Sequence, residues 1–321
     1  NRIKNQIHRT QPIMKNLTYY LSFALWFIIS LLPLWVFYRL SDGLYYLVYH
    51  VVRYRRRVVY ANLRSSFPEK SEAEIERIAK DFYSFFCDYI VETLKLFSMG
   101  EKNMRKRMKF EGLDQVREDF ANGRSASAYL GHYCNWEWIS SLGLHLDEQC
   151  GQIYHPLENA TLDRLFFYMR GRFKAQSIKM DDTFLTILKW KKEGRKNIVG
   201  YIADQVPGYN NIHYWADFLH HDTPVFTGAE RISKIMDTAV YYIDVERPRR
   251  GYYVARFIKI ADSLNEHPVF FATEQYFRLL EQNIQRAPQY WLWSHKRWKR
   301  TREEFNRMFT EEERKKRLSK P

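Results

Sequence analysis

Residues 129–138 read YLGHYCNWEW, and the interpretation of the whole chain starts from this run. The preceding segment, Ser125–Leu130, is small and apolar and follows the turn signal Asn122-Gly123, so it predicts a buried strand. After the run, apolar side chains recur at near-helical spacing from Trp138 to Leu146. The pattern therefore predicts a strand, a short loop and a helix.

This arrangement places His132 at the carboxyl end of the strand and Glu137 in the first turn of the helix, with Asn135 at the N-cap position. On one continuous helix the His–Glu pair would lie about 140° apart, but the break between strand and helix lets the two side chains converge. An imidazole oriented by a carboxylate is a general base, and a helix N-terminus adds hydrogen-bond donors. The spacing alone favours a core histidine beside a surface glutamate, and the strand and helix patterns around the pair change that balance.

Composition restricts the class of protein. The chain has 321 residues, an aromatic content of 17% and a net charge of +14, so an anionic partner is expected. Nucleic acid and an anionic membrane surface both qualify, and the surplus of aromatic residues favours an interface between apolar and aqueous regions. Cys87, Cys134 and Cys150 show no paired spacing, which indicates a reducing compartment.

The N-terminal region predicts a membrane anchor. Residues 1–13 are polar and basic and are treated as a cloning-derived or upstream remnant, with Met14 as the natural start. Leu17–Tyr38 contains 22 residues without a charge, enough to cross a hydrocarbon core of about 30 Å, although Pro33 favours a tilt or a partly re-entrant path. The basic run Arg53–Arg57 makes this flank cytoplasmic. A signal peptide and a buried core helix are the alternatives.

The rest of the chain alternates between strand and helix patterns. Ser71 and Glu74 form a capping box before a long helix. Further on, apolar strands and amphipathic helices follow one another, which predicts an α/β sandwich with a mixed central sheet flanked by helices. His132 and Asp204 both follow predicted strands, where polar side chains mark a site. We expect an anchor at 14–58, a catalytic domain at 59–300 and a charged tail at 301–321.

Several motifs occur in order along the chain. They are Tyr60-Ala61-Asn62-Leu63, Phe67-Pro68-Glu69, Gly131-His132-x4-Glu137, Asp204-Gln205, Thr227-Gly228-Ala229-Glu230-Arg231 and residues 287–299, which read APQYWLWSHKRWK. Together they resemble the late acyltransferases of lipid A biosynthesis, the lauroyl/myristoyl group of the lysophospholipid acyltransferase superfamily. The resemblance covers residues 15 to 300 approximately and implies the glycerolipid-acyltransferase fold.

The resemblance implies acyl transfer from an acyl carrier protein or coenzyme A thioester to a hydroxyl of a lipid A precursor, with His132 as base and Glu137 as its orienting partner. The backbone N–H groups of Tyr133, Cys134 and Asn135 are expected to stabilise the oxyanion. Cys134 also offers an alternative route through an acyl-cysteine. No cofactor and no metal are expected, and His213, His220, His221 and Asp222 are read as a solvated loop.

Six further residues are assigned to substrate binding: Arg164, Arg170, Asp204, Gln205, Glu230 and Arg231. Arg164, Arg170 and Arg231 suit phosphates of the acceptor or donor, although ordinary ion pairing on helices explains them equally well. Asp204 and Gln205 are assigned to substrate, with capping of the following loop as the alternative for Asp204, and Glu230 has an open role.

The basic and aromatic residues of 291–300 are read as a membrane-interfacial helix or strand rather than a nucleic-acid stripe. The expected location is the cytoplasmic side of a bacterial inner membrane, with a carrier protein, a lipid acceptor and the membrane surface as partners and no nucleic acid. The residues between His132 and Glu137 are bulkier and more polar than the aliphatic filler of enterobacterial members. A lysophospholipid or an amino-acid-containing lipid is therefore the alternative acceptor. A non-catalytic membrane-tethered scaffold and a nucleic-acid-binding protein are the readings from other classes.

Overall fold

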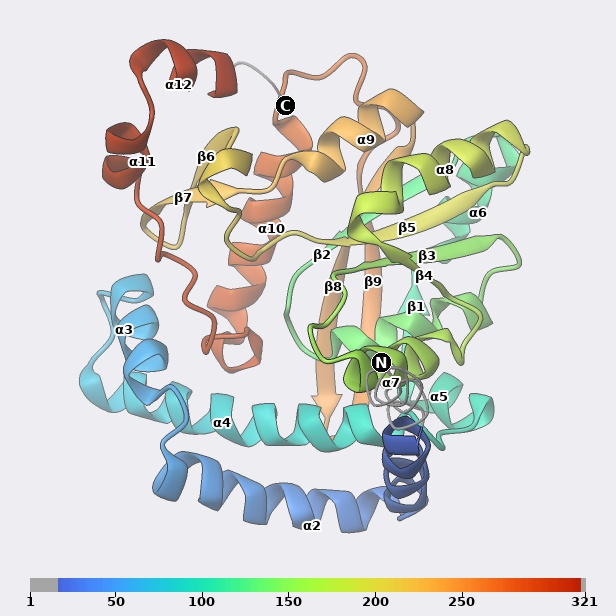
Figure 1. The fold of residues 1–321 in the computed structure, drawn as a ribbon, viewed down its shortest axis with the longest axis vertical. Helices are drawn as coiled ribbons and strands as arrows, with labels where there is room; N and C mark the ends of the chain where they lie inside the picture. The colour runs from blue at the N-terminus through green and yellow to red at the C-terminus, as the bar shows by residue number, and fades with distance from the viewer. Residues whose placement is uncertain (1–16, 319–321) are drawn as a thin grey trace, which may run out of the picture.

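A seven-stranded mixed sheet runs through the centre of the computed structural model (Figure 1). Its strand order is β1-β9-β8-β2-β5-β3-β4; only the β8–β9 pair is antiparallel, and a separate hairpin is formed by β6 and β7. The predicted α/β architecture with a mixed sheet and flanking helices is confirmed. The structure describes residues 17–318, so the predictions for residues 1–13 and Met14 lie outside the described residues.

The strands span β1 Met108–Glu111, β2 Ala126–Leu130, β3 Gln149–Tyr154, β4 Gln176–Lys179, β5 Asn197–Ile202, β6 Tyr214–Phe218, β7 His221–Val225, β8 Ala239–Arg249 and β9 Tyr252–Ala261. The main helices are α2 Leu34–Tyr45, α3 Arg56–Ser66, α4 Glu72–Lys95, α5 Glu101–Arg107, α6 Leu113–Ala121, α7 Ala160–Gly171, α8 Thr183–Lys192, α9 Gly228–Met236, α10 Phe271–Arg286, α11 Arg302–Met308 and α12 Glu311–Leu318. A π-helical turn, Tyr46–Val52, continues α2. Short 3-10 helices include Trp136–Leu144 and Pro288–Tyr290.

The two faces of the sheet have different neighbours. Ala128 pairs with Gly200 and Leu130 with Ile202, so these side chains share one face, which the 3-10 helix Trp136–Leu144 covers. On the opposite face the ring of Tyr129 packs 5.3 Å from that of Tyr276 in α10. Because both faces of the parallel strands are covered, β2 is buried along its whole length.

The long helix α4 begins as predicted. The Ser71 side chain accepts a hydrogen bond from the N–H of Glu74, and the Glu74 carboxylate accepts one from the N–H of Ser71. This reciprocal capping box satisfies two helix-terminal donors. The apolar stripe that follows, including Ile75 and Phe82, is buried in the main core, as its helical spacing predicts.

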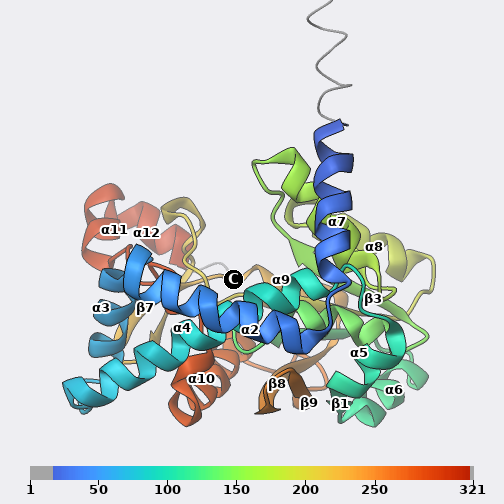
Figure 2. The ribbon, with the colours of Figure 1, turned by 90° about the horizontal axis from the view of Figure 1, so that it is seen from below.

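The N-terminal apolar run forms a bent pair of helices. Pro33 precedes α2, and the helices Leu17–Ser30 and Leu34–Val52 meet at 107°. Within residues 17–318, no one helix has both the length and the apolar composition to cross a bilayer, and this pair qualifies only when its two members are taken together. Helix α2 lies along α4 (Figure 2), burying Phe37 and Ser41 while Trp35 stays 70% exposed.

Two local predictions are wrong. The segment with His213, His220, His221 and Asp222 is the hairpin β6–β7, in which Asp217 pairs with Asp222 across an antiparallel ladder. Residues 291–300 form no membrane-interfacial helix or strand. Trp291, Trp293 and Arg297 are buried, because this segment threads back between the hairpin, α3 and the loop after β2.

Candidate active site

Two neighbouring strand ends bring together the residues of the candidate active site. Strands β2 and β5 are parallel and adjacent, with Leu130 opposite Ile202. His132 and Asp204 each lie two residues beyond that pair. The register of the sheet, rather than proximity in sequence, therefore places them side by side, at the edge where parallel strands present ligand-binding groups.

His132 and Asp204 are joined by two hydrogen bonds. The Nδ1 atom of His132 lies 2.6 Å from Oδ1 of Asp204, and the backbone N–H of His132 donates to Oδ2 at 2.8 Å. The indole N–H of Trp291 also donates to Oδ2, at 2.8 Å. Burial alone would raise the pKa of Asp204, but the electrostatic influence of the adjacent His132 and these hydrogen bonds hold it below its ordinary value. Asp204 is therefore a buried carboxylate in its ionised form.

Gly131 makes this close approach feasible. A Cβ atom at residue 131 would lie 2.7 Å from Cδ1 of Leu280 and 3.3 Å from Oδ2 of Asp204. A larger residue would require the Leu280 side chain or the Asp204 carboxylate to shift. The glycine before the histidine thus leaves the space that the side chains of Asp204 and Leu280 occupy.

The bond to Asp204 fixes which nitrogen of His132 is basic. A carboxylate at Nδ1 requires the proton on that nitrogen, which leaves the lone pair on Nε2. The amide Nε2 of Gln205 lies 3.2 Å from this atom and donates to it. The His132 side chain is 18% exposed and lines a cavity, so Nε2 faces a space that a substrate can enter.

This cavity has a volume of about 470 Å³ and runs from His132 across the apolar face of the sheet. Gly200 and Ala128 leave room on the floor, where larger side chains would fill it. A Cβ atom at residue 200 would have no neighbour closer than 3.6 Å. The apolar lining of the cavity consists mainly of Ala128, Leu130, Trp136, Ile139, Leu142, Ile153, Leu157, Met180, Ile198, Gly200, Ile202 and Phe226.

Glu137 is bonded to Arg170 instead of His132. The guanidinium of Arg170 donates from Nε to Oε2 at 2.8 Å and from Nη2 to Oε1 at 2.5 Å. Such a two-point pair is a strong and directional contact. Both side chains line the cavity, so the structure brings them to the site, but the carboxylate that contacts His132 is Asp204. His132 is thus oriented by Asp204 and not, as expected, by Glu137.

The loop after His132 is held in an unusual conformation. Cys134 has a φ of 53°, and its N–H donates to the carbonyl of Tyr290 at 3.0 Å, so it is not free to bind an oxyanion. Its thiol is fully buried and points to the carbonyl of Val245, and burial raises its pKa well above the ordinary value. Both observations oppose the acyl-cysteine alternative.

Asn135 is the N-cap that the sequence predicts. Its Oδ1 accepts from the N–H of Trp138 at 3.2 Å, while its Nδ2 donates to Oε2 of Glu92 at 2.7 Å. Glu92 is fully buried in α4 and also accepts from the hydroxyls of Tyr253, at 2.7 Å, and Tyr38 of α2, at 2.9 Å. Sequence reasoning missed Glu92. The available signal was an acidic residue inside an apolar helical stripe.

Three other predicted residues lie elsewhere. The guanidinium of Arg164 stacks 3.7 Å above the ring of Tyr19, and Arg231 is exposed on α9. Glu230 is buried and accepts from the N–H and hydroxyl of Thr273 at the start of α10. None of the three belongs to the described residues that line the cavity. Trp291, in contrast, donates a hydrogen bond to Asp204. It belongs to the motif at 287–299 but was not predicted as a site residue.

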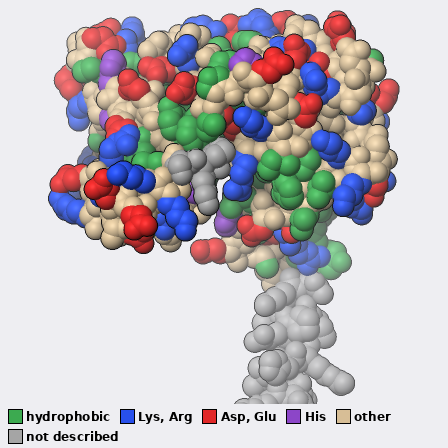
Figure 3. Space-filling model, turned by 90° about the horizontal axis from the view of Figure 1, so that it is seen from above, with side chains coloured by type: hydrophobic (Ala, Val, Ile, Leu, Met, Phe, Trp, Pro, Cys, Tyr) green, Lys and Arg blue, Asp and Glu red, His purple; other side chains and the backbone are tan. Residues whose placement is uncertain are grey.

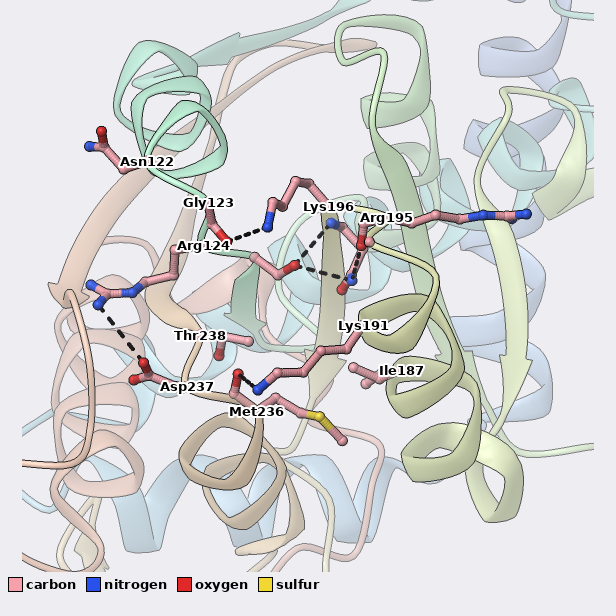
Figure 4. Close-up of a pocket in the computed structure, with 13 residues that line it drawn as sticks. Asn122, Gly123, Arg124, Ile187, Lys191, Arg195, Lys196, Met236, Asp237 and Thr238 are labelled. Carbon is pink, nitrogen blue, oxygen red and sulfur yellow. Dashed lines mark hydrogen bonds and ion pairs between the residues drawn. The ribbon is translucent and has the colours of Figure 1, made fainter.

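A second cavity, of about 280 Å³, lies at the amino ends of β2, β5 and β8 (Figure 4). The cationic side chains that line this cavity already have partners within the protein. Lys191 donates to the carbonyl of Met236 at 2.8 Å and Lys196 to that of Gly123, so both stabilise helix C-termini. The candidate base lies at the opposite edge of the sheet. This cavity is therefore not the catalytic site.

Comparisons with known proteins agree with the geometry. The sequence profile described as bacterial lipid A biosynthesis acyltransferase matches residues 5–300. The chain is 24% identical over 281 residues to a lipid A biosynthesis lauroyltransferase of Escherichia coli (strain K12), covering 86% of this chain and 89% of that protein.

Two further relatives give similar values. A palmitoleoyltransferase of the same strain is 22% identical over 76% of this chain and 79% of its own length. A lipid A biosynthesis acyltransferase of Haemophilus influenzae (strain ATCC 51907 / DSM 11121 / KW20 / Rd) is 23% identical over 88% and 90%. The extent of the profile match shows the family: this chain is an acyltransferase that belongs to the bacterial lipid A biosynthesis acyltransferases.

Proposed function

We propose that this chain transfers a fatty acyl group from a carrier-protein or coenzyme A thioester to a hydroxyl of a lipid A precursor, with His132 as general base and Asp204 as its orienting carboxylate. The observation that carries this proposal is the buried Asp204–His132 pair at the mouth of an apolar cavity. The family relationship supports the acceptor class.

The proposed reaction uses the Nε2 lone pair of His132, from which the acceptor hydroxyl displaces the Gln205 amide. Nε2 takes the proton of the acceptor hydroxyl as its oxygen attacks the thioester carbonyl carbon. The tetrahedral intermediate then collapses with cleavage of the C–S bond, and the imidazolium returns the proton to the leaving thiolate. Asp204 stabilises the imidazolium in both steps because its charge lies beside Nδ1.

Charge on the carbonyl oxygen needs fixed donors. The amide of Gln205 lies beside Nε2, where the reacting atoms meet, and the backbone N–H groups of Tyr133 and Asn135 remain candidates. Arg170, held by Glu137, places a positive charge in the wall of the same cavity. We assign Glu137 the role of fixing that arginine.

The acyl chain is assigned to the apolar part of the cavity. Its floor of Gly200, Ala128 and Ile202 and its roof of Ile139 and Leu142 are suited to a hydrocarbon chain, because they bury apolar surface without polar partners. The bent helix pair is assigned to membrane association on the cytoplasmic side of the inner membrane. Its exposed apolar residues, such as Trp35, Leu40 and Ile28, support this assignment.

The test is an acyl-transfer assay with detergent-solubilised full-length enzyme. Labelled acyl-carrier-protein and acyl-coenzyme A thioesters are each offered with a lipid A precursor, a lysophospholipid and an amino-acid-containing lipid. We expect transfer to the lipid A precursor, reduced at least about 10³-fold in His132→Ala. Transfer that persists in His132→Ala would reject the mechanism, and transfer to another acceptor alone would reject the substrate.

A further inference from the structure

We propose that a basic groove beside the active site binds a phosphate group on the headgroup of the acceptor. The basic groove is defined by the cationic residues Arg53, Arg55, Arg56, Arg57, Lys296 and Lys299. This inference rests on the proposed function, since it concerns the acceptor of the same reaction. It adds a binding site for phosphate that lies outside the acyl cavity.

The basic groove consists of two adjoining hollows. One has a volume of about 540 Å³ and is lined by Arg53, Arg55, Arg56 and Arg57. The other, of about 470 Å³, shares Arg57 and adds Lys296 and Lys299. No carboxylate belongs to the described residues that line either hollow. On the face shown in Figure 3, by comparison, acidic and basic side chains are interspersed.

Three of these cations are not neutralised by the protein. Across residues 17–318, the side chains of Arg57, Lys296 and Lys299 make no ion pair or hydrogen bond. Two partly buried arginines of the same chain, Arg170 and Arg247, behave differently, since each pairs with a carboxylate. Unpaired cations that converge on one hollow attract a multiply charged anion, for which phosphate is the usual partner.

The basic groove is connected to the catalytic loop through residues 291–299. The N–H of Leu292 donates to the carbonyl of His132 at 3.1 Å, and the ring of His295 accepts from the N–H of Val206. Lys296 follows directly in the chain. These contacts fix the position of the groove relative to His132.

Helix α3 holds the other wall in place. Asn62 donates to the carbonyls of Trp293, at 2.8 Å, and His295, at 2.9 Å, and Arg55 donates to that of Ser294 at 3.1 Å. Binding of a remote phosphate on such a fixed wall restricts how the acceptor lies across the site. Part of the binding free energy thus serves to orient the reacting hydroxyl.

The experiment compares the triple variant Arg57→Ala/Lys296→Ala/Lys299→Ala with the wild type. Lys102→Ala on α5 is the control, because this exposed lysine lies on the opposite side of the molecule from α3 (Figures 1 and 2). KM is measured for the acceptor at saturating donor and for the donor at saturating acceptor. Each series uses a phosphorylated acceptor and its dephosphorylated form, in detergent micelles.

We expect the triple variant to raise the KM of the phosphorylated acceptor roughly 10- to 100-fold, with little effect on the dephosphorylated acceptor or on the donor. An equal loss with both acceptors would overturn the proposal. A rise in the donor KM alone would assign the basic groove to the phosphate of the donor's prosthetic arm or to an acidic carrier protein.

Weakened sedimentation with anionic vesicles and unchanged acceptor KM would assign the groove to bilayer headgroups. Direct titration of both acceptor forms by calorimetry separates this proposal from the proposed function. Phosphate-dependent binding that the triple variant loses would support the basic groove even if no acyl transfer were found. Equal binding of both forms by the wild type would reject it.

Discussion

Nδ1 of His132 lies 2.6 Å from Oδ1 of Asp204, although 72 residues separate the two in sequence. The motif acid Glu137, only five residues from the histidine, is bonded to Arg170. The two carboxylates of the site thus have different partners, one orienting the candidate base and the other holding a cation. Substitutions at each position are expected to have distinct signatures.

Asp204→Asn should lower kcat roughly 10²- to 10⁴-fold with little change in KM, because an amide cannot stabilise the imidazolium and allows the wrong tautomer. Glu137→Gln should instead lower thermal stability together with activity, because the guanidinium of Arg170 would lose its negatively charged partner. Initial rates and melting temperatures check both. A large kcat loss in Glu137→Gln at unchanged stability, with Asp204→Asn active, would restore Glu137 as the orienting acid.

Gly200→Val should shift the preference of the enzyme to shorter acyl chains. Residue 200 has room for a Cβ atom, so the added methyl groups project into the cavity without displacing the backbone. Competition between donors of different chain length measures the shift. Gly208→Val is the control, because this glycine also has open space but does not line the cavity. An unchanged preference would place the acyl chain elsewhere.

Cys134→Ala should retain transfer within about threefold, because its buried thiol has a raised pKa and faces Val245 rather than the cavity. No acyl adduct should appear by mass spectrometry of the wild type quenched during turnover. A thioester adduct on Cys134, with loss of activity in the variant, would favour the covalent route.

The His295 side chain predicts acid sensitivity of the fold. Burial is the main cause that lowers its pKa to about 4 from the ordinary 6.5; Asp204 opposes it, while Arg297, His132 and Lys299 add to it. Between pH 6.5 and 4 the His295 ring takes up a proton in the unfolded chain but not in the folded one. The free energy of unfolding therefore decreases as the pH is lowered from 6.5 to 4.

His295→Gln should remove part of that loss, on the order of 2 kcal/mol after allowing for partial exposure of the ring. Chemical denaturation across this pH range measures it, with the exposed His155→Gln as control. Parallel pH curves for the wild type and His295→Gln would show that the ring titrates alike in both states.

Local sequence patterns located one half of the site. The apolar run at 125–130 is strand β2, and Asn135 caps the following helix as its residue type predicts. The rule that polar residues mark strand ends selected both His132 and Asp204. Their pairing was not predicted, because it depends on β2 and β5 being neighbours in register, which no local pattern reports.

Other misses have similar physical causes. The hairpin β6–β7 contains His221 and Asp222, so its strands lack the apolar alternation on which strand prediction depends. Read from the sequence alone, Trp291 and Trp293 look like membrane-interface residues. The same amphipathic side chain also suits a protein core that offers a hydrogen-bond acceptor to the indole N–H. Trp291 finds that acceptor in Asp204, and Trp293 in the carbonyl of Pro288.

The bonds at Glu92 connect the position of α2 to the chemistry. Tyr38, on the inner side of α2, shares the Glu92 carboxylate with Asn135, three residues after the candidate base. A shift of α2 along α4 would break the hydrogen bond from Tyr38 to Glu92. The carboxylate could then reorient toward its two other donors, Asn135 and Tyr253. The catalytic loop is thereby mechanically linked to a helix whose outer side is apolar. Hydrogen exchange of residues 132–138 in micelles and in bilayers would show whether the surroundings of that helix tune the base.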